Sequence, residues 1–153
     1  IAQLRLELTE QGYLKENRKA PKPPKALPPM EFRSSDGFRI LVGRNNHQND
    51  RLTLKTAEKF DIWMHTQSVH GAHIIVCCGG ETPPDRTLEE AAILAAYYSK
   101  GRNSAQVAVD YCLNKFVKKP QGARPGMVIY TNYQTAFVTP DAALVDQLRV
   151  PET

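Results

Sequence analysis

The sequence has 153 residues, of which 41% are hydrophobic and 24% are charged, as expected for a folded chain rather than a disordered one. No apolar run approaches the roughly 20 residues of a membrane-spanning helix, so we expect no membrane partner. The net charge of +4 permits a nucleic-acid partner without requiring one. The three cysteines are odd in number and lie in apolar surroundings, which favours buried thiols over a disulfide and predicts a reducing, cytoplasmic location.

The first thirty residues differ in composition from the rest. Residues 1–14 carry Ile1, Leu4 and Leu8 at a spacing near 3.5, which predicts either the end of a coiled coil or a surface helix. Residues 15–30 hold five prolines and five lysines or arginines, which predicts an extended basic linker, either a passive spacer or a contact to phosphates. Since the chain begins inside a helical pattern, we expect it to be a piece of a longer protein.

Residues 31–153 are predicted to form one domain. Its first half contains a hairpin around 35–37, a helix, and two further strands, of which the last is almost wholly apolar and therefore central. The helix is expected to start at a cap formed by Asn49 or Asp50. The predicted elements are strands 32–34 and 38–42, a helix ending near Lys59, and strands 60–65 and 73–78.

The second half is expected to begin with an alanine-rich helix at 87–99, in which Thr87 and Glu90 match the capping-box spacing. Strands at 106–112 and 116–119 follow, then a hairpin of 127–131 and 135–139, then a helix from Asp141 to about Leu148. The sum is an α+β fold: a mostly antiparallel sheet of about six short strands, packed on one long and one or two short helices.

Residues 43–73 concentrate polar groups between two apolar strands. They begin with four Asn or Asp within 45–50, which are followed by the only Trp of the chain (Trp63) and three of its four His. Buried polar atoms cost about 1–3 kcal/mol each when unpaired, so these groups either satisfy one another or face a polar ligand. For Trp63 itself, core packing is favoured over a role in base stacking.

Catalytic and metal chemistry find little support in this stretch. His65, His70 and His73 with Asp61 match none of the strong zinc spacings, and Cys77 and Cys78 lack the basic neighbours that lower a thiol pKa. Asp50 and Asp61 read more simply as a cap and a hydrogen-bond acceptor than as an acid–base pair. We therefore expect no metal, no cofactor and no catalytic residue.

A basic run between residues 100 and 124 points to RNA instead. This segment holds six Lys or Arg and a single acidic residue, Asp110, which is the kind of run that contacts phosphates. A solvent-exposed rim without a partner would have the same composition. Tyr97, Tyr98 and Tyr111 are candidates for stacking on bases. The predicted RNA-binding residues are Arg44, Asn45, Asn46, Asn49, Asp50, Asp61, His65, His73, Lys100, Arg102, Lys115, Lys118, Lys119 and Arg124.

Several blocks in the same order resemble a known family. VGRNNHQND, LTLKTA, DIWMHTQSVHGAHIIV, LEEAAILAAYYSK and KKPQGARPGMVIYTN resemble the NFACT-R domain, the C-terminal module of bacterial RqcH proteins, which have also been called FbpA-type fibronectin-binding proteins and which are related to the eukaryotic factor NEMF. Relatives usually have Pro-Gly-Ser-His where this chain has residues His70 to His73, so His70 is a weaker candidate for a shared function.

The resemblance implies a role in ribosome-associated quality control. Proteins of this kind bind the large ribosomal subunit that carries a stalled nascent chain and recruit alanyl-tRNA, so that an alanine tail is added at the ribosome's own peptidyl-transferase centre. The expected partners are therefore the large subunit and tRNA, with no enzyme activity in this chain. The older family name keeps a second hypothesis open, a cell-surface domain that binds fibronectin.

Overall fold

The computed structural model describes residues 27–151. The predicted coiled-coil end and most of the predicted linker lie outside this range, while Leu27 to Pro29 lead directly into the first strand. No helix within the described part of the chain is long and apolar enough to span a bilayer.

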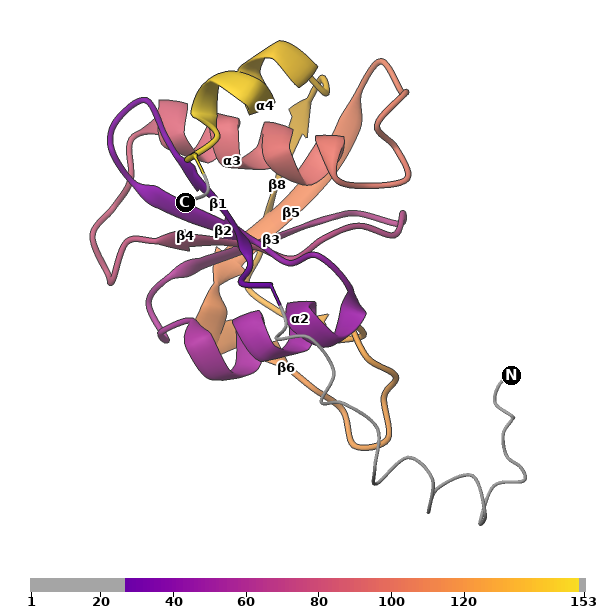
Figure 1. Cartoon of the computed structure of the whole chain (residues 1–153). Coiled ribbons are helices and arrows are strands. Elements are labelled where there is room, and N and C mark those ends of the chain that lie inside the picture. The colour runs from indigo at the N-terminus through magenta and orange to yellow at the C-terminus, as the bar shows by residue number, and fades with distance from the viewer. Residues whose placement is uncertain (1–26, 152–153) are drawn as a thin grey trace, which may run out of the picture.

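A six-stranded sheet, antiparallel at every pairing, forms the middle layer of the domain (Figure 1). The strand order is β1-β2-β4-β3-β5-β8, so the nearly all-apolar β4 is central, as its sequence predicts. The strands are β1 (Met30–Arg33), β2 (Arg39–Val42), β3 (Ile62–Thr66), β4 (Ile74–Cys77), β5 (Val107–Leu113) and β8 (Gln134–Val138).

Helices cover the two faces of this sheet unequally. The long helix α3 (Asp85–Tyr97) and the C-terminal α4 (Ala142–Leu148) cover one face, and α2 (Asn46–Arg51) lies on the other together with the small pair β6 (Val117–Lys118) and β7 (Ile129–Tyr130) (Figure 1). A π-helical turn, Leu52–Thr56, extends α2, and a 3-10 turn, Asn114–Phe116, precedes β6.

The alternation of side chains along β3 builds two separate cores. Met64 points into the core under α3, while Trp63, the preceding residue, lies in a smaller cluster with Leu52, Ile75 and Cys112 on the α2 side. Both side chains are fully buried. Because neighbouring residues of a strand face opposite sides, one strand supplies both layers, as its pattern predicts.

Three predicted details are wrong. The first helix begins earlier than expected, because Asn45 and not Asn49 or Asp50 is its N-cap and accepts a hydrogen bond from Gln48 N. The predicted C-terminal hairpin does not form: β7 pairs with β6, and β8 pairs with β5. Turn signals are local in sequence, and they do not fix which strand lies beside which.

The predicted capping box of α3 does not form either. The helix begins at Asp85, two residues before Thr87, and has no side-chain cap. Thr87 Oγ1 instead lies 3.0 Å from Asp36 Oδ2, to which it donates, and Glu90 accepts hydrogen bonds from Ser35 N (2.8 Å) and Ser35 Oγ. The two residues therefore join α3 to the β1–β2 hairpin turn rather than stabilise the helix end.

Candidate nucleic-acid interface

The chain entering α2 is shaped by a set of local hydrogen bonds. Asn45 caps the helix through Gln48 N, and the side chain of Gln48 in turn accepts from Arg44 N at 2.7 Å and donates to Leu27 O at 2.9 Å. Arg44 Nε donates to Pro28 O at 2.6 Å. These bonds place the Arg44 side chain beside the start of α2 and tie the extended Leu27–Pro29 segment to it.

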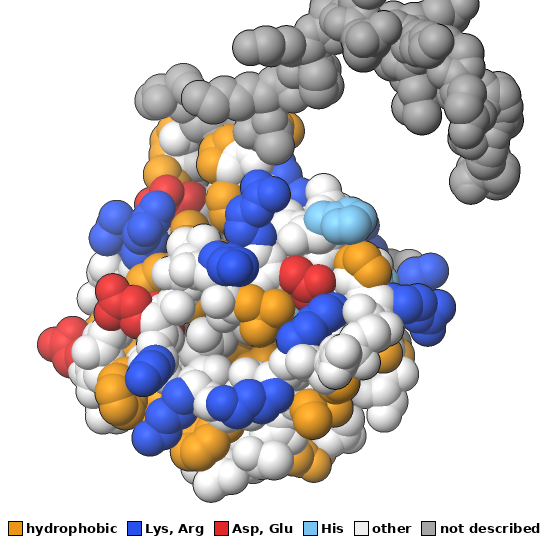
Figure 2. Space-filling view, turned by 90° about the horizontal axis from the view of Figure 1, so that it is seen from below, with side chains coloured by type: hydrophobic (Ala, Val, Ile, Leu, Met, Phe, Trp, Pro, Cys, Tyr) orange, Lys and Arg blue, Asp and Glu red, His pale blue; other side chains and the backbone are white. Residues whose placement is uncertain are grey.

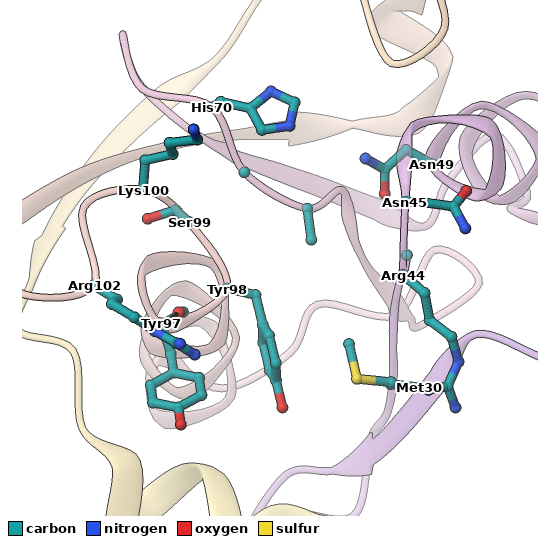
Figure 3. A pocket seen from close by; sticks show the side chains of 13 residues that line it. Met30, Arg44, Asn45, Asn49, His70, Tyr97, Tyr98, Ser99, Lys100 and Arg102 are labelled. Carbon is teal, nitrogen blue, oxygen red and sulfur yellow. Dashed lines mark hydrogen bonds between the residues drawn. The ribbon is translucent and has the colours of Figure 1, made fainter. Parts of the chain in front are cut away.

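A groove of about 460 Å³ lies between the start of α2 and the turn that follows α3 (Figure 3). We call it the tyrosine groove. It brings together five of the predicted residues, which come from two segments more than fifty positions apart. The groove is lined by Met30, Gly43, Arg44, Asn45, Asn49, His70, Gly71, Ala72, Tyr97, Tyr98, Ser99, Lys100 and Arg102.

Arg102 and Tyr97 form a stacked pair at one side of the groove. The guanidinium carbon of Arg102 lies 4.2 Å from the centre of the Tyr97 ring, and its Nε donates to Tyr97 O at 3.0 Å. Tyr98 packs edge-on against Tyr97, with ring centres 5.0 Å apart. A guanidinium that lies over an aromatic ring can still present donors to a phosphate, and its planar group can contact a base.

Lys100 adds a second cation to the same side, because its backbone N donates to His70 O (2.8 Å) and fixes the turn after α3 beside the loop after β3. Gly71 permits this close approach. A side chain at that position would bring its Cβ to within 2.9 Å of both Ser99 Cβ and Thr66 Oγ1. The groove therefore offers cations from both sides and aromatic rings, which is the chemistry that single-stranded nucleic acids require.

Asn49, which lines the groove, and His73, which is hydrogen-bonded to it, are bonded mainly within the protein. Asn49 is 2% exposed, and its Oδ1 accepts from His73 N at 3.1 Å. Gly43 makes room for it, since a Cβ there would lie 1.9 Å from Asn49 Oδ1. His73, 1% exposed, lies 2.8 Å from Thr53 Oγ1 through Nδ1 and 3.2 Å from Gly126 O through Nε2. Because a carbonyl only accepts, Nε2 carries the proton and Nδ1 accepts from Thr53.

Burial keeps His65 and His73 uncharged at pH 7. It lowers the pKa of His73 to about 4 and also lowers the pKa of His65 from its usual value of 6.5. The His65 ring stacks parallel on Trp63 with centres 5.9 Å apart, and Tyr130 lies 4.6 Å from Trp63 on another side. The indole Nε1 of Trp63 has no hydrogen-bond partner within residues 27–151.

A second pocket, of about 330 Å³, adjoins the tyrosine groove, and His70 lines both. We call it the tryptophan pocket. Its walls come from β3, the loop after β3, and the segment that leads into β7. It is lined by Trp63, His65, Thr66, Ser68, Val69, His70, His73, Gly126, Met127, Val128 and Tyr130.

The loop beyond the tryptophan pocket is held by an ion pair. Lys119 Nζ lies 3.1 Å from Asp50 Oδ2 and donates to Met127 O (3.1 Å) and to Arg124 O, while Asp50 Oδ1 accepts from Gly126 N at 3.0 Å. Asn46 packs against the same glycine, where an added Cβ would come within 2.7 Å of its Oδ1. Three residues predicted to bind RNA, Asn46, Asp50 and Lys119, therefore shape this loop.

The remaining predicted cations lie on the face that carries α2 and β6. Lys and Arg side chains are spread over this face with few Asp and Glu among them (Figure 2). Lys115 rests over the rings of Phe60 (4.9 Å) and Phe116 (5.1 Å), while Lys118 and Arg124 are exposed. The basic run is therefore divided between two places, since Lys100 and Arg102 line the tyrosine groove and the others do not.

Asp61 lies apart from both pockets and has a structural role. It is 5% exposed, and its carboxylate accepts from Glu58 N, Cys78 N and Gly79 N at 2.9–3.1 Å, which joins the ends of β3 and β4.

Burial raises the pKa of both Cys77 and Cys112 to about 11, so these thiols stay protonated and unreactive near neutral pH. In the part of the chain that the structure describes, no three His, Cys, Asp or Glu side chains converge on a metal-sized site.

Several residues that line the two pockets are not singled out by the sequence. Tyr130 and Met127 lie in the last block of the family resemblance, KKPQGARPGMVIYTN, which is the only signal that points to them. Tyr130 OH donates to Asp110 Oδ2 at 2.6 Å, a contact between β7 and β5 of the main sheet that no local pattern predicts. Tyr111, by contrast, packs on the α3 side and lies away from both pockets.

Comparison with known proteins gives a consistent result. Residues 29–132 match the family described as the NFACT protein RNA binding domain. The chain is 43% identical over 152 residues to the Rqc2 homolog RqcH of Bacillus subtilis and 39% identical over 150 residues to that of Streptococcus pneumoniae. The match covers 97% of this chain in both cases but only about a quarter of these relatives, 26% and 27%.

A solved structure is also similar. It is the C-terminal part of the fibronectin/fibrinogen-binding protein from Streptococcus suis, with a TM-score of 0.82 and 39% sequence identity. The match covers 92% of this chain and 56% of that one. Sequence and fold thus point to the same family.

Proposed function

This chain belongs to the family of NFACT RNA-binding domains, and from that premise we propose that it is the RNA-binding module of a ribosome quality-control factor like RqcH. The single observation that carries the proposal is the tyrosine groove, in which Arg102 stacks on Tyr97 and Lys100 lies beside it, opposite Arg44. Phosphates would meet the cations, and unpaired bases would stack on the tyrosine side.

In the whole factor, the partners would be the large ribosomal subunit with its stalled chain and alanyl-tRNA, and the outcome would be a C-terminal alanine tail. Peptide transfer would occur at the ribosome, so this chain would act in the cytoplasm as a binding module and not as an enzyme. The identity of 43% to a protein named Rqc2 homolog RqcH supports this assignment.

Fibronectin binding is the second candidate, because the similar solved structure is named a fibronectin/fibrinogen-binding protein. Surface plasmon resonance separates the two. The chain is immobilised, and a tRNA, a single-stranded RNA and fibronectin are passed over it at physiological salt. RNA binding that Lys100→Ala weakens, with no fibronectin signal, is the expected result. Fibronectin binding without RNA binding would reverse the assignment.

A further inference from the structure

We propose that the tryptophan pocket accepts one unstacked nucleobase of a single-stranded RNA whose phosphates lie in the adjoining tyrosine groove. This inference rests on the proposed function and adds to it the form of the ligand: a strand with at least one base turned out, rather than a duplex held by its backbone alone.

The wall of the tryptophan pocket presents aromatic rings. Trp63 is fully buried, so the accessible aromatic surface is that of the rings which cover it, His65 and Tyr130. Both rings are held in place. His65 stacks on Trp63 with an interplanar angle of 6°, and the hydroxyl of Tyr130 is bonded to Asp110. Rigid aromatic rings at the side of a cavity form a stacking platform for a flat heterocycle.

Positive charge gathers in the tyrosine groove and not in the tryptophan pocket. The cations of this region, Arg44, Lys100 and Arg102, line the groove, whereas the described residues that line the tryptophan pocket include no Lys, Arg, Asp or Glu. His65 and His73 both have lowered pKa values because they are buried, so their rings are neutral at pH 7. A phosphate is therefore drawn to the groove, and the pocket suits an uncharged ring.

The size and position of the tryptophan pocket also suit a single base. The pocket volume of about 330 Å³ is at the lower end of the range for small-ligand sites, about 300–1000 Å³. His70 lines both cavities, so a strand can pass from one to the other without leaving the surface. The exposed hydroxyl of Ser68 offers a polar atom for the edge of a base, and the exposed thioether of Met127 can adapt to the ring that enters.

The test uses the whole chain and a short single-stranded RNA of mixed sequence. Each nucleotide in turn is replaced by an abasic one, which keeps the phosphate and removes the base, and affinity is measured by fluorescence anisotropy. Stacking of one base predicts that one abasic position weakens binding about 5- to 150-fold, while neighbouring positions have smaller effects. Trp63 is the only tryptophan, so its fluorescence should change with the intact RNA and not with that abasic RNA.

Two variants locate the effect. In His65→Ala, the penalty for the sensitive abasic position should disappear, whereas in Lys100→Ala all the RNAs should bind more weakly and the penalty should remain. Tyr130→Phe, which keeps the ring, serves as the second pocket variant and should retain the penalty, and circular dichroism checks that each variant is folded. If RNA binds but every abasic position is tolerated, or if the penalty survives in His65→Ala, the base pocket is wrong and the proposed function stands. If no RNA binds, both fail.

Discussion

At the scale of single residues, His73 shows how the polar stretch is satisfied. It is buried, hydrogen-bonded at both ring nitrogens, and next to Trp63 and His65. Its backbone N also donates to the side chain of Asn49. His73 and Asn49, both prominent in the sequence as polar groups, therefore hold α2 and the start of β4 together. In the proposed RNA complex their role would be to fix the walls of the two pockets.

The lowered pKa of His73 predicts a loss of stability in acid. The unfolded chain takes up this proton near pH 6.5, but the folded chain does so only at about 4, so acidification through that interval favours unfolding. Between about pH 7 and about pH 4.5, the expected loss is about 2 kcal/mol of unfolding free energy. Urea unfolding at about pH 7 and about pH 4.5 measures it, with His73→Gln as the comparison. An equal loss of stability in both proteins would contradict the assignment.

Glu90 gives a second prediction at this scale. The residue is 6% exposed, and its carboxylate accepts hydrogen bonds from both the backbone N and the hydroxyl of Ser35. Glu90→Ala removes both hydrogen bonds, each worth about 0.5–1.5 kcal/mol net, and should therefore cost about 1–3 kcal/mol of unfolding free energy. Glu89→Ala, one position away and exposed, is the matched control and should cost little. Equal values for the two variants in chemical denaturation would remove this role for Glu90.

The sequence indicates which residues are polar and close to apolar strands, but not whether each one faces solvent. Asn45 and Asn49 differ by one turn of helix, yet the first is an exposed cap and the second is buried against Gly43. Thr87 and Glu90 have the spacing of a capping box, yet their partners are in a hairpin more than fifty residues earlier. The spacing of residues predicts hydrogen bonds within one helix, whereas these hydrogen bonds join segments that lie far apart in the sequence.

At the scale of elements, the loop between β6 and β7 depends on α2. Lys119 and Asp50 are paired, and together they bond to the backbone of Arg124, Gly126 and Met127. This segment forms one wall of the tryptophan pocket, so its order decides whether the pocket exists. Lys119, which the sequence predicts as a phosphate ligand, is thus part of the support of the site.

Hydrogen exchange can test this dependence. In Lys119→Ala, the hydrogen-bonded amides of Gly126 and Met127 should exchange about five-fold faster, since about 1 kcal/mol of local stability is removed. Lys118→Ala, the exposed neighbour on β6, should leave these amides unchanged. If both variants gave the same protection as the unaltered chain, the ion pair would not be what holds the loop.

Strands and helices are easier to predict than their pairings. The predicted strands 127–131 and 135–139 largely coincide with β7 and β8, but each pairs elsewhere, β7 with β6 and β8 with β5. The turn at Asn132 suggested a hairpin, and Asn132 does have a positive φ of 54°. A turn reverses the chain without fixing which strand lies beside it, because that choice depends on the faces being buried.

At the scale of the whole molecule, the α+β class and the central position of β4 follow from the apolar patterns, and the family follows from ordered sequence blocks. The sequence does not predict that the start of α2 and the turn after α3 lie on either side of one groove. Because of this arrangement, Lys100 and Arg102 lie at the tyrosine groove with Arg44. The other cations of the basic run, such as Lys118 and Arg124, lie on the face of α2 and β6.

The central claim is that the cations of the tyrosine groove bind RNA phosphates. The most direct measurement is the salt dependence of the affinity for a single-stranded RNA, compared between the unaltered chain and the Lys100→Ala, Arg102→Ala double variant. The logarithmic slope should become shallower by about 1.4, which is roughly 0.7 for each phosphate that is no longer neutralised. Arg86→Ala, about 20 Å away at the other end of α3, should keep the full slope. An unchanged slope in the double variant, or an equal change in Arg86→Ala, would contradict the claim.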